Sequence, residues 1–347
     1  MKRILTLFLL ALVVMLFQNN IWVKLTLVWP AYLTFPQHIK TLVIVDRTEQ
    51  SETMESKIEQ TLSGEFLEQD EQAIAKLIEG TVNLCSGTQR FNIIRTGERS
   101  IGGGTKNTFP SPLSWTEVTK HCQKHNADAV MSIEIFDSDF IITSNPFQEE
   151  VKGKDGVVSQ VTKYMATGVT VLNIGIRIYD PKTKKIFDEY RVTERFNTEA
   201  SAVNAQDAVN SLLDKVEAIN RTSYNVGYAY GKRISPYYYT VKREFYDKPK
   251  KSKYLQEGAR KSEVSDWEGA IESWLKVFES KNKKDVKAYG KAAFNIAVAY
   301  EVLGNLEKAK EWASKSYTVY EDKEASDYYK ALKKRERNEA VVQNQMP

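Results

Sequence analysis

Residues Ala292 to Tyr317 read AAFNIAVAYEVLGNLEKAKEWASKSY, and this stretch decides the fold of the carboxy-terminal part of the chain. Two helical patterns meet in it at the turn sequence Leu303-Gly304-Asn305. Small residues at Ala297, Ala309 and Ala313 fall where two antiparallel helices must touch. The stretch therefore predicts a pair of closely packed helices.

A second copy of this pattern lies upstream. Its equivalent positions hold Tyr254, Gly258, Trp267, Ala270 and Trp274. Over residues 254–320 the two copies resemble tetratricopeptide (TPR) repeats, which stack and present a groove to another polypeptide. The copies stand further apart than the TPR period of about 34 residues, because a polar insertion at Lys281–Asp285 separates them. A polar helix over Ala325–Asn338 and a frayed tail are expected within residues 321–347.

The composition is that of a globular protein and argues against nucleic acid as a partner. The 347 residues are 42% hydrophobic and 27% charged, which is ordinary for a chain with two cores. The 49 basic residues are offset by 45 acidic ones, and the formal net charge is +4. This balance gives no electrostatic footprint for nucleic acid, and we expect no nucleic-acid partner.

The amino-terminal sequence MKRILTLFLLALVVMLF places Lys2 and Arg3 ahead of an apolar run from Ile4 to Phe17. This layout is typical of a secretory signal, so we expect export to the periplasm or cell envelope. Gln18-Asn19-Asn20 stand where a small-residue cleavage site is usual, and the run is shorter than the roughly 20 residues that span a bilayer. A cleaved signal peptide, an uncleaved signal anchor and a buried core helix stay open for residues 1–20, with an extended lead-in at 21–38.

Residues 39–246 alternate strand and helix patterns and predict a mixed-sheet α/β domain. The apolar run Lys40–Val45, ended by Asp46-Arg47, is typical of a buried parallel strand. Ser114 and Glu117 have capping-box spacing ahead of a helix. The predicted βαβαβ elements are strands at 40–45, 91–95 and 128–136 and helices at 71–84 and 114–127.

After this unit the pattern becomes antiparallel. Lys154-Asp155-Gly156 predicts a hairpin turn, and Thr167–Tyr179 alternates as a long strand. Asp180-Pro181-Lys182-Thr183 is a second turn, after which Lys185–Phe196 returns. One helix over Ala202–Asn225 is expected to cover a face of the sheet.

Four segments carry a resemblance to known envelope domains: KTLVIVDRT, FNIIRTGE, NADAVMSIEIFDSDF and VTVLNIGIRIYDPKTKKIFDEYRV. They resemble strands of the periplasmic domains of the curli secretion lipoprotein CsgG, the penicillin-binding-protein activator lipoproteins and the TolB amino-terminal domain. The resemblance to CsgG implies an oligomeric assembly or secretion component. Membrane hairpins would need alternation over about 10 residues per strand, and Asp139 to Val158 is too polar to serve.

The chain is also similar to a family of uncharacterised bacterial envelope proteins, usually predicted lipoproteins. The similarity lies in a WPA-like segment at 29–31, an RISPYYYTVKREFY-like segment from Arg233 to Tyr246 that closes the domain, and the TPR-like helices after it. It implies architecture and location, and no activity. The first cysteine is Cys85, so a lipid-bearing cysteine near the signal segment is missing. Residues 247–253 are expected to form a basic linker.

Four residues of the second TPR-like copy are the predicted partner-binding site: Lys291, Asn295, Val298 and Val302. Lys291 and Asn295 lie one helical turn apart on the surface that lines a TPR groove. Their spacing resembles part of the clamp by which some TPR proteins hold a partner's terminal carboxylate. The equivalent upstream residues, Ser252 and Gln256, do not repeat it. A structural role for the asparagine is the alternative.

Two motifs with binding chemistry have simpler interpretations. His121 and His125, with Cys122 between them, could face one metal ion, but no third ligand is visible from spacing. We therefore interpret them as part of a solvated helix face and expect no metal site. The glycine-rich stretch 101–106 lacks the spacing of a phosphate-binding loop, so it is interpreted as a connection.

Three further features stay ambiguous between function and structure. Asp46 and Arg47 lie at a strand end where open α/β sheets bind ligands, although strand termination and local capping explain them more simply. The aromatic and basic segment 233–246 could stack on sugars or a peptide, and an edge strand or closing segment that packs against the sheet is the preferred interpretation. Cys85 and Cys122 could form one bridge, and two buried thiols are preferred.

Enzymatic function has little support in the sequence. It contains no G-x-S-x-G motif, no paired metal motif and only 3 histidines. We predict a non-enzymatic cell-envelope adaptor that needs no cofactor and binds another envelope protein or peptide through its TPR-like repeats. The alternatives are an oligomeric assembly or secretion component, which would be a homo-oligomer, and a peptidoglycan- or carbohydrate-binding envelope protein. Membrane association would use residues 4–17.

Overall fold

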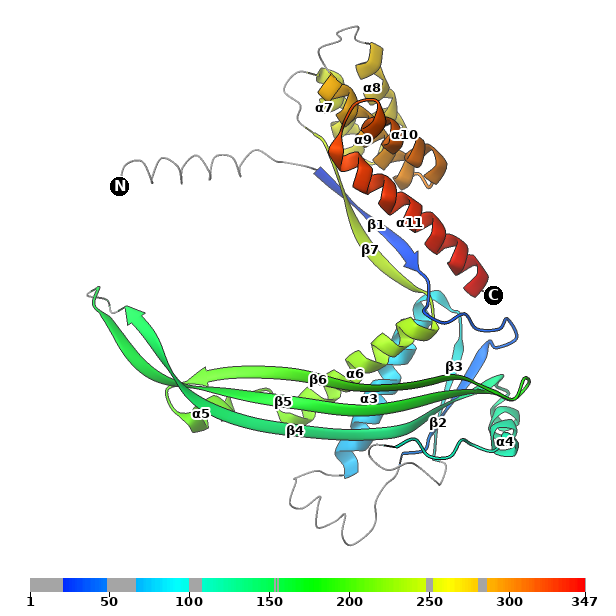
Figure 1. The fold of residues 1–347 in the computed structure, drawn as a ribbon, viewed down its shortest axis with the longest axis vertical. Coiled ribbons are helices and arrows are strands. Elements are labelled where there is room, and N and C mark those ends of the chain that lie inside the picture. The colour runs from blue at the N-terminus through cyan, green and yellow to red at the C-terminus, as the bar shows by residue number, and fades with distance from the viewer. Residues whose placement is uncertain are drawn as a thin grey trace. The chain divides into compact units, whose positions relative to one another are not determined.

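The computed structural model of the chain describes residues 21–48, 67–99, 108–152, 154, 156–247, 252–279 and 286–346. These residues form two compact units (Figure 1). The sheet unit comprises residues 31–237 and the end of the chain from Asn344, and the helical unit comprises residues 21–30 and 238–343. The expected order of an α/β region followed by a helical region is therefore confirmed.

The sheet unit contains a five-stranded mixed sheet in the order β3-β2-β4-β5-β6. In its centre, β2 (Thr41–Asp46) runs parallel to both of its neighbours, β3 (Asn92–Arg99) and β4 (Ala129–Lys152). From there β4, β5 (Val158–Asp180) and β6 (Lys185–Ala202) follow one another in antiparallel order. The predicted βαβαβ unit with added antiparallel strands is thus confirmed.

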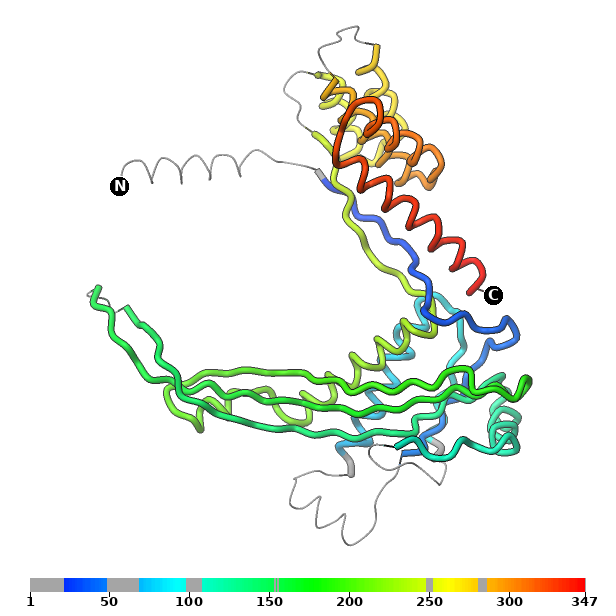
Figure 2. The backbone as a smooth tube through the Cα atoms, in the orientation of Figure 1, coloured from blue at the N-terminus to red at the C-terminus, as the bar shows by residue number. Residues whose placement is uncertain are grey.

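Helices cover both faces of the sheet around β4. α3 (Leu67–Thr88) and α6 (Lys215–Ile234) pack together along one face, α4 (Trp115–His125) lies on the other, and the short α5 (Ala205–Asn210) contacts β5 and β6 (Figures 1 and 2). The capping box predicted before α4 is present, with the Ser114 hydroxyl accepting from the Glu117 amide. The apolar stripe of each helix thus meets the buried face of the sheet.

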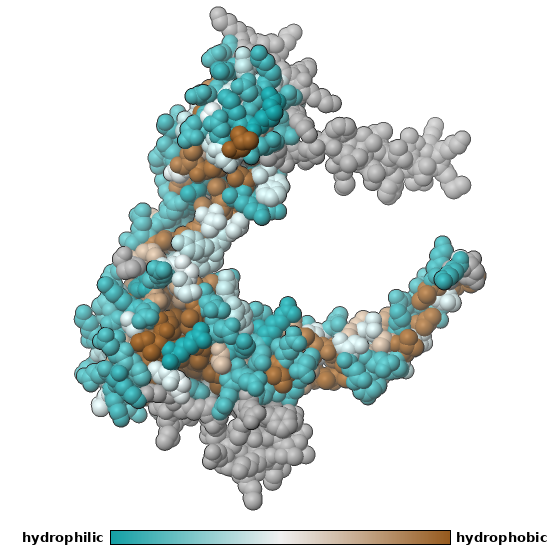
Figure 3. All heavy atoms as spheres, turned by 180° about the vertical axis from the view of Figure 1, so that it is seen from behind, coloured by the Kyte–Doolittle hydropathy of each residue, from teal (hydrophilic) through white to brown (hydrophobic). Residues whose placement is uncertain are grey.

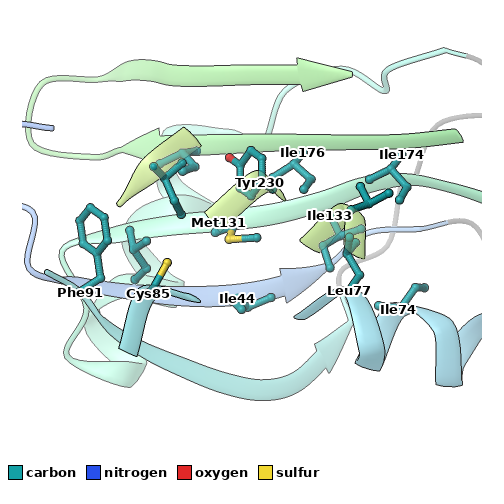
Figure 4. Packing of buried hydrophobic residues seen from close by; sticks show 14 of the residues in the cluster. Ile44, Ile74, Leu77, Cys85, Phe91, Met131, Ile133, Ile174, Ile176 and Tyr230 are labelled. Carbon is teal, nitrogen blue, oxygen red and sulfur yellow. The ribbon is translucent and has the colours of Figure 1, made fainter. Parts of the chain in front are cut away.

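The main hydrophobic core lies between the sheet and the α3–α6 pair. Met131 and Ile133 of β4 and Ile176 of β5 meet Leu77 of α3 and Tyr230 of α6 there (Figure 4). All five side chains are fully buried. Alternate residues of each strand point to this face, which is why the period-two pattern of the strands indicated the core.

The two long helices approach one another through glycines. A Cβ atom added to Gly227 of α6 would lie 1.9 Å from the Leu77 carbonyl oxygen, and one added to Gly80 of α3 would lie 2.1 Å from the Tyr224 carbonyl oxygen. Real side chains never come so close to backbone atoms. Glycine is therefore required at both positions for α3 and α6 to pack at this distance.

Three strands of the sheet are far longer than its helical cover. Strands usually have about 3–10 residues, whereas β4 has 24, β5 has 23 and β6 has 18. Only Ala129–Ile133 of β4 pairs with β2, so the rest of β4 continues with β5 and β6 as a ribbon (Figures 1 and 2). Hydrophobic and hydrophilic residues are interspersed along this ribbon (Figure 3). The polar segment from Asp139 is thus a strand, and its hairpin turn follows Lys152, which pairs with Val158.

In the described residues, the helical unit combines a two-stranded ribbon with five helices. β1 (Ile21–Trp29) pairs with β7 (Tyr237–Phe245). The helices, in chain order, are α7 (Lys253–Glu263), α8 (Trp267–Glu279), α9 (Val286–Val302), α10 (Leu306–Thr318) and α11 (Lys323–Gln345). α7 packs on α8, α8 on α9, and α9 on α10. Among the described residues, no helix is both apolar and long enough to cross a bilayer.

The helix pair predicted from residues 292–317 is present. Gly304 has a φ of 79°, which glycine adopts readily, and Asn305 caps α10 by accepting from the Lys308 amide. The alanines that mark the contact between the two helices are fully buried: Ala297, Ala309 and Ala313. Small side chains at these positions allow α9 and α10 to pack closely.

One expectation about strands is wrong. The segment at 233–246 does not pack against the five-stranded sheet, because its residues Tyr237–Phe245 form β7, which pairs with β1. The extended lead-in at 21–38 contains β1. Both strands alternate, with Trp22 and Lys24 exposed on β1 and Tyr238 exposed on β7. Since about 200 residues of sequence separate the strands, local patterns could not indicate that they pair.

Two expectations about helices are also wrong. The single helix predicted over Ala202–Asn225 is two helices, because Asp214 caps α6 by accepting from the Val216 and Glu217 amides and so starts a new helix. The predicted frayed tail is helical, since α11 extends to Gln345. Gln345 is buried. Its side-chain oxygen accepts from the Ala31 backbone nitrogen at 2.8 Å, and its side-chain nitrogen donates to the Ala31 backbone oxygen at 2.9 Å.

Candidate functional site

The candidate site is the surface of the helical unit that holds the end of β7. Asn295 of α9 accepts a hydrogen bond from the Tyr246 backbone nitrogen at 2.8 Å and donates one to the Tyr246 backbone oxygen at 2.7 Å. The Asn295 side chain is fully buried. One amide thus satisfies both polar backbone groups of a residue in extended chain. Such a contact binds main chain and does not depend on the side chain of the residue held.

An aromatic pocket takes the preceding side chain. Phe245 is 2% exposed, and its ring meets those of Trp267 and Trp274 edge-on at centroid distances of 5.9 and 6.2 Å. The Trp274 indole is fixed because its nitrogen donates to the Leu255 carbonyl at 3.2 Å. Burying such a phenylalanine contributes about 1.5–3 kcal/mol.

A buried ion cluster fixes the strand two residues earlier. Arg243 of β7 donates to both carboxylate oxygens of Glu301, at 2.7 and 3.1 Å. Tyr328 and Arg335 of α11 donate to the same carboxylate at 2.7 and 3.2 Å. Burial by itself would raise the pKa of Glu301, but the hydrogen bond and charge of Arg243 outweigh it and hold the pKa below its usual value. Glu301 therefore stays ionised and joins β7, α9 and α11.

The Tyr246 side chain makes a third set of contacts. Its ring lies 5.4 Å from that of Phe294, and the Lys291 ammonium sits 4.5 Å from its centroid. Its hydroxyl donates to the Glu324 carboxylate at 3.1 Å. Burial and the nearby Asp322 and Glu324 carboxylates raise the pKa of Tyr246 far above its usual value, so the phenol remains a donor. Backbone, pocket and ion cluster together hold the end of β7 on the helices.

The structure places the four predicted partner-binding residues in two environments. Asn295 and Val298 are fully buried, whereas Lys291 and Val302 are partly exposed. The expectation that Asn295 lines an open groove is wrong for this structure, because the end of β7 occupies its amide. Partner binding through Lys291 and Val302 stays a prediction.

Sequence reasoning missed most of this site. The available signals were the alternation of Tyr237–Phe245 and the single acidic residue, Glu301, in the apolar stretch of α9. A buried carboxylate needs a cationic partner. The pattern therefore indicated that some arginine or lysine must meet Glu301, although it could not identify Arg243 or Arg335.

The strand-end pair Asp46 and Arg47 has the simpler, structural role. Asp46 accepts from the Thr48 amide at 2.9 Å, and Arg47 donates to Glu134 at 3.1 Å. Glu134 is fully buried at a bulge of β4 and also accepts from Arg177 at 2.8 Å. This arrangement joins β2, β4 and β5 by buried ion pairs.

The structure also places the residues that were candidates for metal binding or for a disulfide. Among the described residues, no three His, Cys, Asp or Glu side chains lie close enough together to hold a metal ion. Cys122, between His121 and His125, is buried in the small core under α4, and Cys85 is buried in the main core. The two cysteines are free, as the preferred interpretation predicted. The glycine-rich stretch 101–106, the insertion 281–285, linker residues 248–251 and the segment 1–20 lie outside the described residues.

Comparison with protein families assigns the larger part of the chain to a family. A family model described as a domain of unknown function (DUF8603) matches residues 39–246. The chain belongs to the DUF8603 family. In this DUF8603 protein a second model, described as a domain of unknown function (DUF6340), matches residues 256–334. A search of curated proteins gives no match. These matches agree with the predicted membership of a family without assigned function.

Two solved structures show distant likeness to the DUF8603 protein. A dodecamer of a point variant of PelC from Paraburkholderia phytofirmans is 11% identical, with 58% of this chain and 98% of that chain covered and a TM-score of 0.18. A putative neuraminyllactose-binding hemagglutinin homolog from Helicobacter pylori is 14% identical, with 58% and 86% covered and a TM-score of 0.21. The resemblances to CsgG and to TPR repeats stay predictions.

Proposed function

We propose that this protein is a non-enzymatic adaptor of the cell envelope, whose TPR-like helices bind an extended segment of another envelope protein or peptide. The observation that carries the proposal is the pair of hydrogen bonds between the Asn295 amide and both backbone polar atoms of Tyr246. A helical surface that binds one extended main chain offers hydrogen bonds and apolar pockets suited to extended polypeptide. Recognition of this kind needs no catalytic residue.

The partner segment would lie beside the end of β7. Lys291 and Val302 are partly exposed and stand about three turns apart on α9, which places them on one face about 16 Å from each other. An extended segment of about five residues covers that length. Lys291 would meet a carboxylate of the partner, and Val302 with the exposed Leu303 would meet an apolar side chain.

Site-specific photo-crosslinking in cells tests this proposal. The photoreactive residue p-benzoylphenylalanine replaces Lys291 or Val302 in the full chain, and Leu275 and Lys276, exposed on α8, serve as matched control positions. We expect a discrete crosslinked product from positions 291 and 302 that is absent from 275 and 276. The proposal is overturned if all four positions give the same pattern, or if 291 and 302 give none.

A second candidate, an oligomeric assembly component, has one observation in its favour. In the described part of the chain, β6 is an edge strand, and β4 beyond Ile133 has no partner strand on its β2 side. Open edges of this length can pair with another copy. Sedimentation of the full chain against a variant with 143–167 replaced by Asn-Gly distinguishes the candidates. Assembly through the ribbon predicts a large oligomer that the shortened variant forms more weakly, because it lacks the part of the β4 edge from Thr143 to Lys152.

A further inference from the structure

The β1–β7 ribbon has one face buried against the helices and one exposed face. On the buried side, Val23 and Phe245 pack in the core of the helical unit. The exposed side carries two large aromatic residues, Trp22 at 48% exposure and Tyr238 at 55%. Because side chains alternate along a strand, Trp22 and Lys24 share this face of β1. Tyr238 lies on the same face nearer the other end of the ribbon, since its neighbour Tyr239 meets Trp29 at a centroid distance of 5.1 Å. Two exposed aromatic rings on one ribbon face give it apolar surface along its length.

Two lysines stand at the exposed tryptophan. The ammonium nitrogens of Lys24 and Lys242 lie 5.5 and 4.9 Å from the centroid of the Trp22 ring. Tryptophan, tyrosine and lysine share one property, an apolar body with a polar tip. They are the residues that concentrate at the boundary between lipid headgroups and acyl chains. The chemistry of the face therefore matches an anionic lipid surface.

The position of the ribbon in the chain supports the same occupant. The apolar run Ile4–Phe17 ends three residues before β1 begins, and such a connection spans at most about 14 Å. If that run enters a bilayer, Trp22 must lie near the headgroups. By sequence, four lysines follow β7 within Lys248–Lys253, although they are not part of the proposed surface. Glu244 also lies on the exposed face and reduces the positive charge of that face, so the attraction to anionic lipid is moderate.

We propose that the exposed face of the ribbon, defined by Trp22, Lys24, Tyr238 and Lys242, lies against an anionic phospholipid surface. Its aromatic rings sit at headgroup level, and its ammonium groups contact lipid phosphates. This inference rests on the proposed envelope location. It does not depend on partner binding by the helices.

Vesicle co-sedimentation tests the proposal. The full chain and residues 21–347 are compared, because the described contacts lie within 21–346 and the shorter chain lacks the apolar run. We expect both to bind vesicles of phosphatidylcholine with phosphatidylglycerol better than vesicles of phosphatidylcholine alone, with binding by residues 21–347 lost as salt is added. The double variant K24Q/K242Q should weaken binding by residues 21–347 roughly thirtyfold, about fivefold for each lysine.

Two controls keep the result specific. The variant K276Q/K287Q, with exposed lysines of α8 and α9 changed, should bind as the unchanged chain does. Brominated phosphatidylglycerol should quench tryptophan emission in the unchanged chain and much less in Trp22→Phe, whose circular dichroism confirms that it is folded. The proposal is overturned if residues 21–347 show no preference for phosphatidylglycerol, if both lysine pairs have equal effects, or if isolated peptidoglycan is bound instead. The crosslinking at positions 291 and 302 is a separate readout, so the two proposals fail independently.

Discussion

Replacing Asn295 by alanine tests the hydrogen-bonding centre of the site. The substitution removes the acceptor of the Tyr246 backbone nitrogen at 2.8 Å and the donor to its oxygen at 2.7 Å. A buried polar group left without a partner costs about 1–3 kcal/mol, and the lower value applies where water enters. Two groups give about 2–6 kcal/mol, and we expect about 3 kcal/mol because the end of β7 can partly shift toward solvent.

Hydrogen exchange measured by mass spectrometry reports this cost locally. Whole-chain unfolding is a poor measure here, because a chain with two compact units need not unfold in one step. The Tyr246 amide proton is held by Asn295 in the unchanged protein and exchanges only when this contact opens. A loss of about 3 kcal/mol corresponds to exchange faster by roughly a hundredfold. Peptides that contain Tyr246 should show this change, and those from β4 and β5 should not.

Matched variants distinguish the loss of the two Asn295 hydrogen bonds from a general weakening of the helices. Gln256→Ala changes an exposed amide on α7 and should leave hydrogen exchange of the Tyr246 peptides unchanged within about twofold, which corresponds to less than about 0.5 kcal/mol. Asn295→Asp keeps the shape and one acceptor but loses the donor to the Tyr246 oxygen, so it should resemble the alanine variant. If Tyr246 stays equally protected in Asn295→Ala, the proposed hold on the main chain is refuted.

Three more outcomes are expected. Gly227→Ala should destabilise the sheet unit by about 1–3 kcal/mol, because its Cβ would meet the Leu77 carbonyl at 1.9 Å and force α3 and α6 apart. Hydrogen exchange of peptides from α3 and α6 measures it. Burial raises the pKa of Cys85 to about 12 and that of Cys122 to about 11, so both thiols should react with a disulfide reagent only after unfolding. Glu301→Gln should destabilise the helical unit by about 3 kcal/mol at neutral pH and remove an acid-sensitive step, which circular dichroism against pH detects.

The sign of the pH effect follows from the lowered pKa of Glu301. The folded state binds the ionised carboxylate more tightly, so the stabilisation is present above the ordinary glutamate pKa of about 4.3 and is lost as pH falls below it. The glutamine variant should lose less stability across that range, because Glu301 no longer contributes to the pH dependence. Equal acid sensitivity in both proteins would contradict the ion cluster. The exposed variant Ser86→Ala on α3 is the control for Gly227→Ala. Thiol reaction in the folded protein at the unfolded rate would contradict the buried cysteines.

The sequence predicted the elements whose signals are local. The Ser114 capping box, the Gly304 turn and the alanine contacts of α9 and α10 each depend on residues within one or two turns of chain, and all three are present. The break between α5 and α6 was also local, since Asp214 is a good cap, but the apolar stripe across it concealed the boundary. β1 and β7 were missed as partners because pairing is a long-range property that alternation alone does not specify.

Asn295 shows where sequence reasoning stops. An asparagine among the apolar residues of α9 must have its amide satisfied, and that requirement is visible in the sequence. Whether the satisfying backbone belongs to the same chain or to a partner is not visible, and here it is the chain's own Tyr246. A partner that displaced this segment would have to replace two buried hydrogen bonds and the Phe245 contact, roughly 3.5–9 kcal/mol in total. A partner lying beside β7, on Lys291 and Val302, meets no such cost, which is why the crosslinking positions are placed there and not at Asn295.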